Sequence, residues 1–314
     1  MQRRVVIAGI ALAVVCTLGY FALVGARRLM GPVHDELACR QVGASPKQAI
    51  VACTALVDLA DRRGVSPADE APMYVNRGRA YAKDGQYARS RADFDAAIEL
   101  APQLADGYWG RATLSLRETR YREAFADYSR AIEIDPDDAG PHAGRGDAAF
   151  HLGRYALAQA DERAAARLSP GWAGPDLNLG EFAFVRGRFA DAADHYARAV
   201  ALSPSSGYAV LELHLVRAHL GRDDRAELSR NAKALDAATW PFPLVAMFLG
   251  TRSPAQAAAA AQGGDHRCEA AFYVAEWYRQ HHDAARASHG FRTAIATCPH
   301  DFVEYDFAPE ELRR

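Results

Sequence analysis

The chain has 314 residues, of which 50% are hydrophobic, and its formal net charge at pH 7 is −2. This composition is typical of an ordered protein rather than a disordered one. The nearly balanced charge argues against the large basic surface of a nucleic-acid-binding protein, so no nucleic-acid partner is expected.

The first element in chain order is an uncharged, apolar run from Val5 to Ala26. At about 1.5 Å per residue, a helix over this run reaches roughly 33 Å, enough to cross a bilayer core of about 30 Å. Three interpretations stay open: a retained signal-anchor, a signal peptide cleaved after Ala26, and a lipoprotein attached at Cys16. Residues 1–34 are therefore expected to be a signal-anchor or signal peptide with a short linker, and residues 5–26 contact the membrane if they are not cleaved.

Four of the five cysteines form two predicted pairs beyond the apolar run. Cys39 lies on a first segment, and Cys53 lies on the helix that follows it. Cys268 and Cys298 fall at positions 1 and 31 of a final repeat unit, which are neighbours in an antiparallel hairpin. Two disulfides need an oxidising compartment, so we expect the repeats to face the periplasm or the cell exterior. The alternative is four buried free thiols in a cytosolic protein.

The centre of the chain has a 34-residue period that three residue types share. The series are Pro102, Pro136, Pro170 and Pro204; Tyr87, Tyr121, Tyr155 and Phe189; and Ala97, Ala131, Ala165 and Ala199. Glycine at position 15 of a unit ends the first helix, and Thr119 stands at this position in the second unit. Proline at position 32 cannot continue the second helix, so it separates neighbouring units.

A helix–turn–helix unit of this length, with these fixed positions, resembles the tetratricopeptide repeat (TPR). The resemblance implies an all-α fold, a TPR α-solenoid in which about seven antiparallel helix pairs form a right-handed superhelix, preceded by an N-terminal apolar helix. It also implies a protein that binds other proteins or peptides in a concave groove and that is not an enzyme.

The period divides the chain into predicted segments. Residues 35–70 form a degenerate N-terminal hairpin that ends in a long loop around Asp61 to Pro67. The segments that follow are four regular units (71–104, 105–138, 139–172 and 173–206), degenerate units over 207–264, a final unit over 268–301 and a C-terminal cap over 302–314.

The C-terminal region carries a second, narrower resemblance. The stretches Trp240-Pro-Phe-Pro, Phe248-Leu249-Gly250 and Glu276-Trp277-Tyr278 look like the corresponding region of bacterial envelope adaptors of the NlpI kind. Such adaptors gather cell-wall hydrolases and proteases. The resemblance implies a non-enzymatic scaffold or adaptor in the bacterial cell envelope. The alternative is a permanent subunit of a membrane-associated complex, docked through its end units or its N-terminal helix.

Arginine and aspartate vary together within the regular units. Arginine stands at position 7 and aspartate at position 23 of the first three units, whereas the fourth unit has Leu179 and His195. This concordance predicts structural ion pairs between the two helices of a unit. The predicted pairs are Arg77 with Asp93, Arg111 with Asp127, and Arg145 with Asp161.

The resemblance places the binding groove at first-helix positions 2, 5, 9, 12 and 13. The candidate partner-binding residues are Arg79, Lys83, Trp109, Thr113, Arg117, Asp147, Phe150, Glu181, Phe184 and Tyr208. Large apolar side chains among them are candidate anchors for a partner segment. A chaperone-type carboxylate clamp is not indicated, because Val75, Arg79 and Gly110 do not match its pattern.

Signals for catalysis are weak. His281, His282 and His289 lie near one another, but the first two occupy a turn and no third metal ligand is indicated. No nucleophile triad, phosphate loop or dinucleotide pattern is present in the sequence. We therefore expect no catalytic residue, metal, cofactor or small-molecule substrate.

Overall fold

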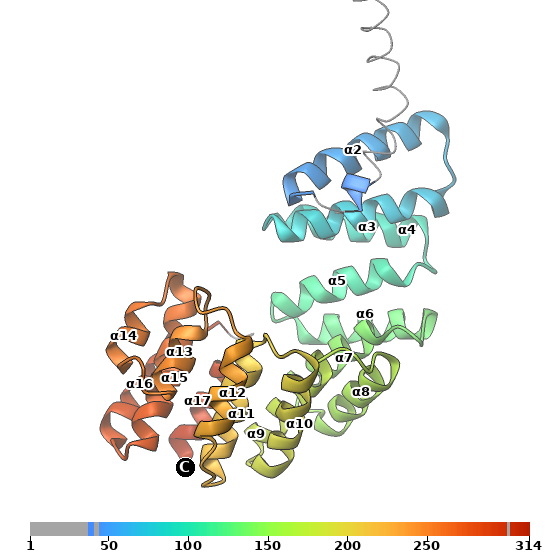
Figure 1. Cartoon of the computed structure of the whole chain (residues 1–314). Coiled ribbons are helices and arrows are strands. Elements are labelled where there is room, and N and C mark those ends of the chain that lie inside the picture. The colour runs from blue at the N-terminus through green and yellow to red at the C-terminus, as the bar shows by residue number, and fades with distance from the viewer. Residues whose placement is uncertain (1–36, 41–43, 300–301) are drawn as a thin grey trace, which may run out of the picture. The chain divides into compact units, whose positions relative to one another are not determined.

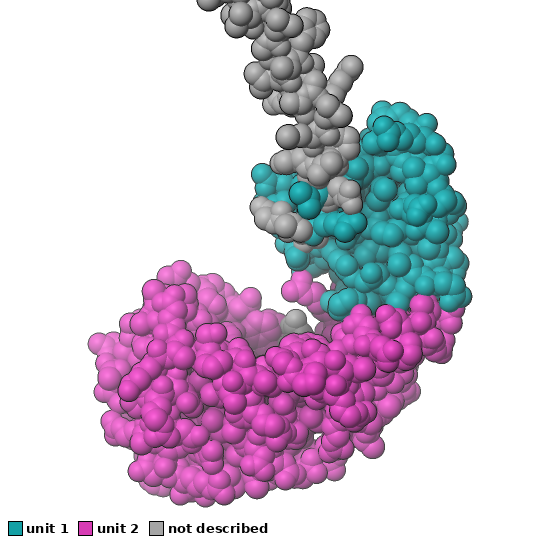
Figure 2. Space-filling model, turned by 45° about the vertical axis from the view of Figure 1, so that its right-hand side comes forward, with its two compact units in different colours: residues 1–114 teal, residues 115–314 magenta. Residues whose placement is uncertain are grey.

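The computed structural model describes residues 37–40, 44–299 and 302–314, and over these residues the chain is helical with no strand (Figure 1). The predicted apolar helix at residues 5–26, with Cys16, lies outside the described residues. Among the described helices, none combines the length and the apolar character that a membrane span requires. The chain divides into two compact units, residues 1–114 and 115–314, which are coloured separately in Figure 2 and are taken one at a time below.

The described part of the first unit contains α2 (Pro46–Arg63), α3 (Pro67–Lys83) and α4 (Tyr87–Leu100), and α5 (Ala105–Arg117) crosses the boundary between the units. The prediction of a long loop around Asp61 to Pro67 is wrong. Helix α2 continues to Arg63, and α3 begins four residues before the expected unit start. The Ser66 side chain caps α3 by accepting a hydrogen bond from the Asp69 N–H, and Pro67 suits the first helical position.

The second unit begins with regular helix pairs. They are formed by α6 (Tyr121–Ile134), α7 (Ala139–His151), α8 (Tyr155–Leu168), α9 (Gly174–Val185), α10 (Phe189–Leu202) and α11 (Gly207–His219). Four short elements follow: α12 (Arg225–Asn231), the 3-10 helix η1 (Ala232–Ala234), α13 (Phe242–Phe248) and α14 (Pro254–Ala259). The chain ends with α15 (Gly263–Gln280), α16 (Ala284–Thr297) and α17 (Val303–Arg313).

The 34-residue period describes the helix pairs well. Each second helix begins at a residue of the aromatic series, and the four alanines of the period are completely buried. The residue at position 15 adopts the left-handed conformation even where it is not glycine, with φ of 57° at Thr119. At Gly180 a Cβ would collide with the Tyr196 ring, which explains a small residue where two helices approach closely. The predicted TPR-like helix pairs are therefore confirmed.

Two disulfides lie where the sequence places them. Cys39–Cys53 belongs to the first unit, with its Cα atoms 4.7 Å apart. Cys268–Cys298 belongs to the second unit, with its Cα atoms 4.9 Å apart, and joins α15 to the residue that follows α16. The last hairpin is therefore linked covalently near its open end.

The sequence predicts that residues 302–314 cap the final hairpin, and helix α17 makes further contacts. It packs against α16 and α15, and it also contacts α9 of the fourth regular unit. Phe307 and Ala308, on its apolar side, are completely or almost completely buried. The end of the chain thus lies beside a helix that precedes it by more than a hundred residues, and this return positions the site described next.

Candidate functional site: an acidic cavity in the second unit

Two of the predicted arginine–aspartate pairs are present. Arg77 donates two hydrogen bonds to Asp93, both 2.8 Å long, and Arg145 donates two of the same length to Asp161. Both aspartates are buried, so these pairs lie inside the hairpins and away from any partner.

Arg111 and Asp127, the third predicted pair, belong to different compact units, and their pairing stays a prediction. Arg111 donates a hydrogen bond of 2.7 Å to Asp95 on α4, within the first unit. In the fourth regular unit, where the arginine is absent, the Nδ1 atom of His195 lies 2.8 Å from Asp176.

The predicted groove residues of the first unit form a small basic and aromatic surface. The guanidinium of Arg79 lies 5.2 Å from the centre of the Trp109 ring and pairs with Asp106. Arg79 and Asp106 also line a cavity of about 230 Å³. Lys83 and Thr113 are exposed on the same helices, α3 and α5. These residues are accessible. Because Asp106 already neutralises the charge of Arg79, this surface does not need a charged ligand.

Two predicted anchors in the second unit are not available to a partner. Phe150 is 6% exposed and stacks on Phe182, with ring centroids 4.4 Å apart. Phe184 is 1% exposed, because it is covered by α17. Both rings belong to the core of this unit, so the prediction that they are exposed anchors is wrong. Position 12 of the third and fourth repeats, where these two rings stand, faces neighbouring helices rather than solvent.

The remaining groove residues of the second unit differ in their surroundings. Arg117 is exposed. Asp147 is half-buried, and its Oδ1 lies 3.3 Å from Nε2 of His151. Glu181 and Tyr208 lie on the same cavity, which has a volume of about 340 Å³. Two of the predicted groove residues, Glu181 and Tyr208, therefore line one concave site.

Four helices build this acidic cavity. Its lining residues are Leu177, Asn178 and Glu181 of α9; Tyr208 and Glu212 of α11; Glu269 of α15; and Phe302, Val303 and Glu304 at the start of α17. The sequence analysis missed Glu212, Glu269 and Glu304. Glu212 did leave a signal, because it is the only charged residue in the run from Tyr208 to Leu213, and a charge within such an apolar stretch needs an explanation.

The glutamates of the acidic cavity are held in an environment that disfavours their charge. Desolvation raises the pKa of Glu212 well above its usual value, and the nearby charge of Glu304 raises it further. The pKa of Glu304 rises to about 8 through burial and the charge of Glu269. Glu181 also has a strongly raised pKa, through desolvation and then the charges of Asp147, Asp306 and the two glutamates Glu212 and Glu304.

Two neutral donors are directed at one of these carboxylates, that of Glu269. The Tyr208 hydroxyl donates a 2.9 Å hydrogen bond to Oε2 of Glu269, and the Trp240 indole N–H donates to the same atom. In contrast, Oε1 of Glu304 is buried without a hydrogen-bond partner, and Glu304 is 2% exposed. Chemically, the acidic cavity is suited to accept hydrogen bonds or a positive charge.

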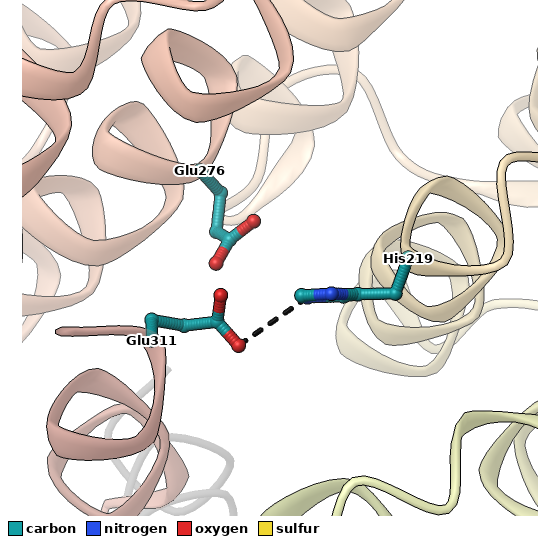
Figure 3. A group of neighbouring side chains, drawn as sticks. All are labelled: His219, Glu276 and Glu311. Carbon is teal, nitrogen blue, oxygen red and sulfur yellow. Dashed lines mark ion pairs between the residues drawn. The ribbon is translucent and has the colours of Figure 1, made fainter. Parts of the chain in front are cut away.

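A second buried cluster of carboxylates lies at the other end of α17 (Figure 3). Potential ligand atoms of His219, Glu276 and Glu311 all lie within 4.8 Å of one another, and Nε2 of His219 is 3.3 Å from Oε1 of Glu311. Arg279 donates hydrogen bonds of 2.7 and 3.0 Å to Glu276 and lies 3.4 Å from Glu311. Arg314 also pairs with Glu311.

The two arginines therefore already supply positive charge to this second cluster. Burial and the charge of Glu311 raise the pKa of Glu276 to about 8. Burial alone would raise the pKa of Glu311 as well, but His219, Arg279 and Arg314 lower it below its usual value. The cluster joins α11, α15 and α17 as a charge network, and we assign it a structural role.

The helix pairs define the class of the protein as an α-solenoid, in which each repeat packs on its neighbours and the stack presents an extended binding surface. Within this class, residues 75–139 and 177–239 match the model of the tetratricopeptide repeat family. Over these two segments, the chain is therefore similar to tetratricopeptide repeats. Repeats of this family are in general interaction modules rather than enzymes.

Solved structures support the fold. A tetratricopeptide repeat protein from Parabacteroides merdae is 12% identical, with a TM-score of 0.53 over 85% of this chain and 92% of its own. PilF of Pseudomonas aeruginosa is 16% identical, with a TM-score of 0.50 over 79% of this chain and 99% of its own. A chain of the APC/C Cut9–Hcn1 hetero-tetramer is 16% identical, with a TM-score of 0.55 over 85% of this chain and 48% of its own.

These likenesses concern the fold alone. No curated protein is similar enough in sequence to count as a relative. The resemblance of the C-terminal region to NlpI-like adaptors is not confirmed by the comparisons.

Proposed function

We propose that this chain is a non-enzymatic interaction scaffold that binds a segment of a partner protein in the acidic cavity of the second unit. One observation carries the proposal: Glu212 and the Oε1 atom of Glu304 are buried at an open cavity, and no described group of the chain donates a hydrogen bond to them. A buried carboxyl group without a partner is costly, and its charged form is costlier still, so such a site favours a ligand that supplies the missing partners. The TPR fold is consistent with a protein or peptide as that ligand.

A matched pair of leucine-to-arginine variants of the full chain tests the proposal. Leu177→Arg places a long, charged side chain in the acidic cavity, whereas Leu168→Arg changes an exposed residue of α8 in the same unit. Proteins that co-purify with the wild type should be retained by the Leu168→Arg variant and lost from the Leu177→Arg variant, as measured by quantitative mass spectrometry. Equal recovery by both variants would contradict the proposal.

The same experiment separates the scaffold from the alternative role of a permanent complex subunit. A subunit docked through its end units or through residues 5–26 would keep its partners in the Leu177→Arg variant. Its co-purification would also survive high salt, because a large, permanent interface is more hydrophobic than a transient one.

We also propose that the repeats work in the bacterial envelope, in the periplasm or secreted to it, and tethered to the membrane if residues 5–26 are retained. Two disulfides support an oxidising compartment. Mass spectrometry of the mature protein from its native cells should find the N-terminus processed or lipidated, or intact in the membrane fraction, with both cysteine pairs oxidised. Reduced cysteines in a soluble cytosolic fraction would contradict this location.

A further inference from the structure

We propose that the acidic cavity recognises a basic side chain, lysine or arginine, that the partner segment presents between apolar residues. The inference rests on the proposed function and deepens it, because it names the chemistry of the group that enters the acidic cavity.

The first support is the number of carboxylates without a partner. Glu212 is 6% exposed, and Oε1 of Glu304 is buried with no hydrogen-bond partner. In the described part of the chain, the carboxylates of Glu181 and Glu212 make no hydrogen bond or ion pair. Three glutamates from three different helices thus converge on one space with unmet acceptors.

The second support is a comparison within the same unit. The other buried carboxylate cluster, at Glu276 and Glu311, contains Arg279 and Arg314, which pair with it directly. None of the described residues that line the acidic cavity is basic. The fold therefore provides arginines for one cluster and leaves the positive charge of the other to come from outside.

The third support is the shape and the mixed character of the acidic cavity. A volume of about 340 Å³ is at the small end for a ligand pocket, which suits one side chain better than a large ligand. Leu177, Phe302 and Val303 provide apolar contacts for the methylene stem of lysine or arginine, while the head group reaches the carboxylates.

The arrangement favours an organic cation over a bare metal ion. A metal ion needs several ligand atoms close together, within the 4.8 Å that the group His219, Glu276 and Glu311 satisfies. Among the described residues, the glutamates of the acidic cavity form no group of three that is this close. A lysine or arginine head group has several donors and can satisfy carboxylates that lie farther apart.

Peptide selection against the immobilised full chain tests the inference. The probe is a displayed library of short random peptides, and the enriched peptides are then synthesised with acetylated and amidated ends, so that no free terminus supplies a charge. We expect a lysine or arginine between apolar residues in these peptides. Replacing that residue by glutamine should weaken binding to the wild type by roughly tenfold to a hundredfold, measured by calorimetry at fixed salt.

The matching protein variants locate the effect. In Glu212→Gln/Glu304→Gln, the same peptide change should alter affinity by less than about threefold, because the two carboxyl groups that can ionise and pair with a bound cation are gone. Glu123→Gln/Glu133→Gln removes two exposed carboxylates of α6 in the same unit and should retain the full effect. If the Glu212/Glu304 variant unfolds, Glu181→Gln and a thermal melt replace it, since Glu181 is only half-buried.

The possible results separate the inference from the proposed function. Peptides that bind in the acidic cavity, shown by their loss in Leu177→Arg, but that lack a basic residue would overturn the inference and leave the proposed function intact. Selected peptides that bind equally well to Leu177→Arg would overturn both. Basic peptides weakened equally by the Glu123/Glu133 control would indicate general electrostatic attraction and would also overturn the inference.

Discussion

Phe184 stacks on Phe307, with ring centroids 4.1 Å apart and planes inclined by 28°. Phe184 lies at a first-helix position where TPR resemblance suggested a partner anchor, and Phe307 belongs to α17 at the end of the chain. The pair therefore shows that the C-terminal helix occupies this part of the second unit. Because the first turn of α17 also lines the acidic cavity, its packing and the candidate site depend on each other.

Phe307→Ala should lower the free energy of unfolding by about 3–5 kcal/mol, because it removes a buried aromatic ring and leaves a cavity. Leu312→Ala, on the same helix but 36% exposed, should change it by less than about 1 kcal/mol. Denaturant unfolding of the two variants measures the difference. Similar values for both would mean that α17 is not docked through Phe307.

Arg279→Met should lower the free energy of unfolding by about 3 kcal/mol, since it leaves Glu276 and Glu311 buried with less positive charge around them. Adding Glu276→Leu to Arg279→Met should recover part of the loss, because the uncompensated charge is then removed. Denaturant unfolding checks both variants. A double variant that is less stable than Arg279→Met would contradict the structural role given to this charge network.

The paired arginines and aspartates make a similar prediction inside a hairpin. Asp161→Ala should destabilise the protein by about 3 kcal/mol, because Arg145 loses both of its hydrogen bonds to a buried carboxylate. The double change Arg145→Leu with Asp161→Ala should cost less, since the fourth unit already has Leu179 at the equivalent position. Thermal melting at one pH measures the stability of both variants. A double variant as unstable as Asp161→Ala would contradict a structural role of the pair.

The pH dependence of stability should reveal the buried glutamates of the acidic cavity. The pKa of Glu304 is about 8 in the folded protein, against 4.5 for an ordinary glutamate. Between these values the folded chain binds more protons than the unfolded chain, so the stability contributed by protonated Glu304 is present below about pH 4.5 and is lost as the pH rises to about 8.

Glu304→Gln removes this dependence. Its free energy of unfolding should match that of the wild type near pH 4.5 and should exceed it increasingly up to about pH 8. Glu133→Gln, at an exposed position on α6, serves as the control and should follow the wild type across the range. Urea unfolding at several pH values measures the differences, and parallel curves for wild type and Glu304→Gln would rule out the raised pKa.

The regular helix pairs are predictable from sequence because their determinants are local. The alanine series marks close helix contacts, and position 15 marks a left-handed turn, which even Thr119 adopts. The pairs Arg77–Asp93 and Arg145–Asp161 are predictable for the same reason, since both partners of each pair belong to one hairpin. The burial of Phe150 and Phe184 could not be predicted from the sequence, because the residue type at position 12 does not show which later helix will cover that side chain.

The sequence by itself determined the repeat, its two-helix unit and the two cysteine pairs, because a solenoid repeat makes most of its contacts with itself and its neighbours. Only the tertiary structure decided the acidic cavity. Glu181, Glu212, Glu269 and Glu304 lie on α9, α11, α15 and α17. The short elements α12 to α14, in which the period is lost, separate α11 from α15. Their convergence depends on the return of α17 to α9, a long-range packing of apolar surfaces that no local period encodes.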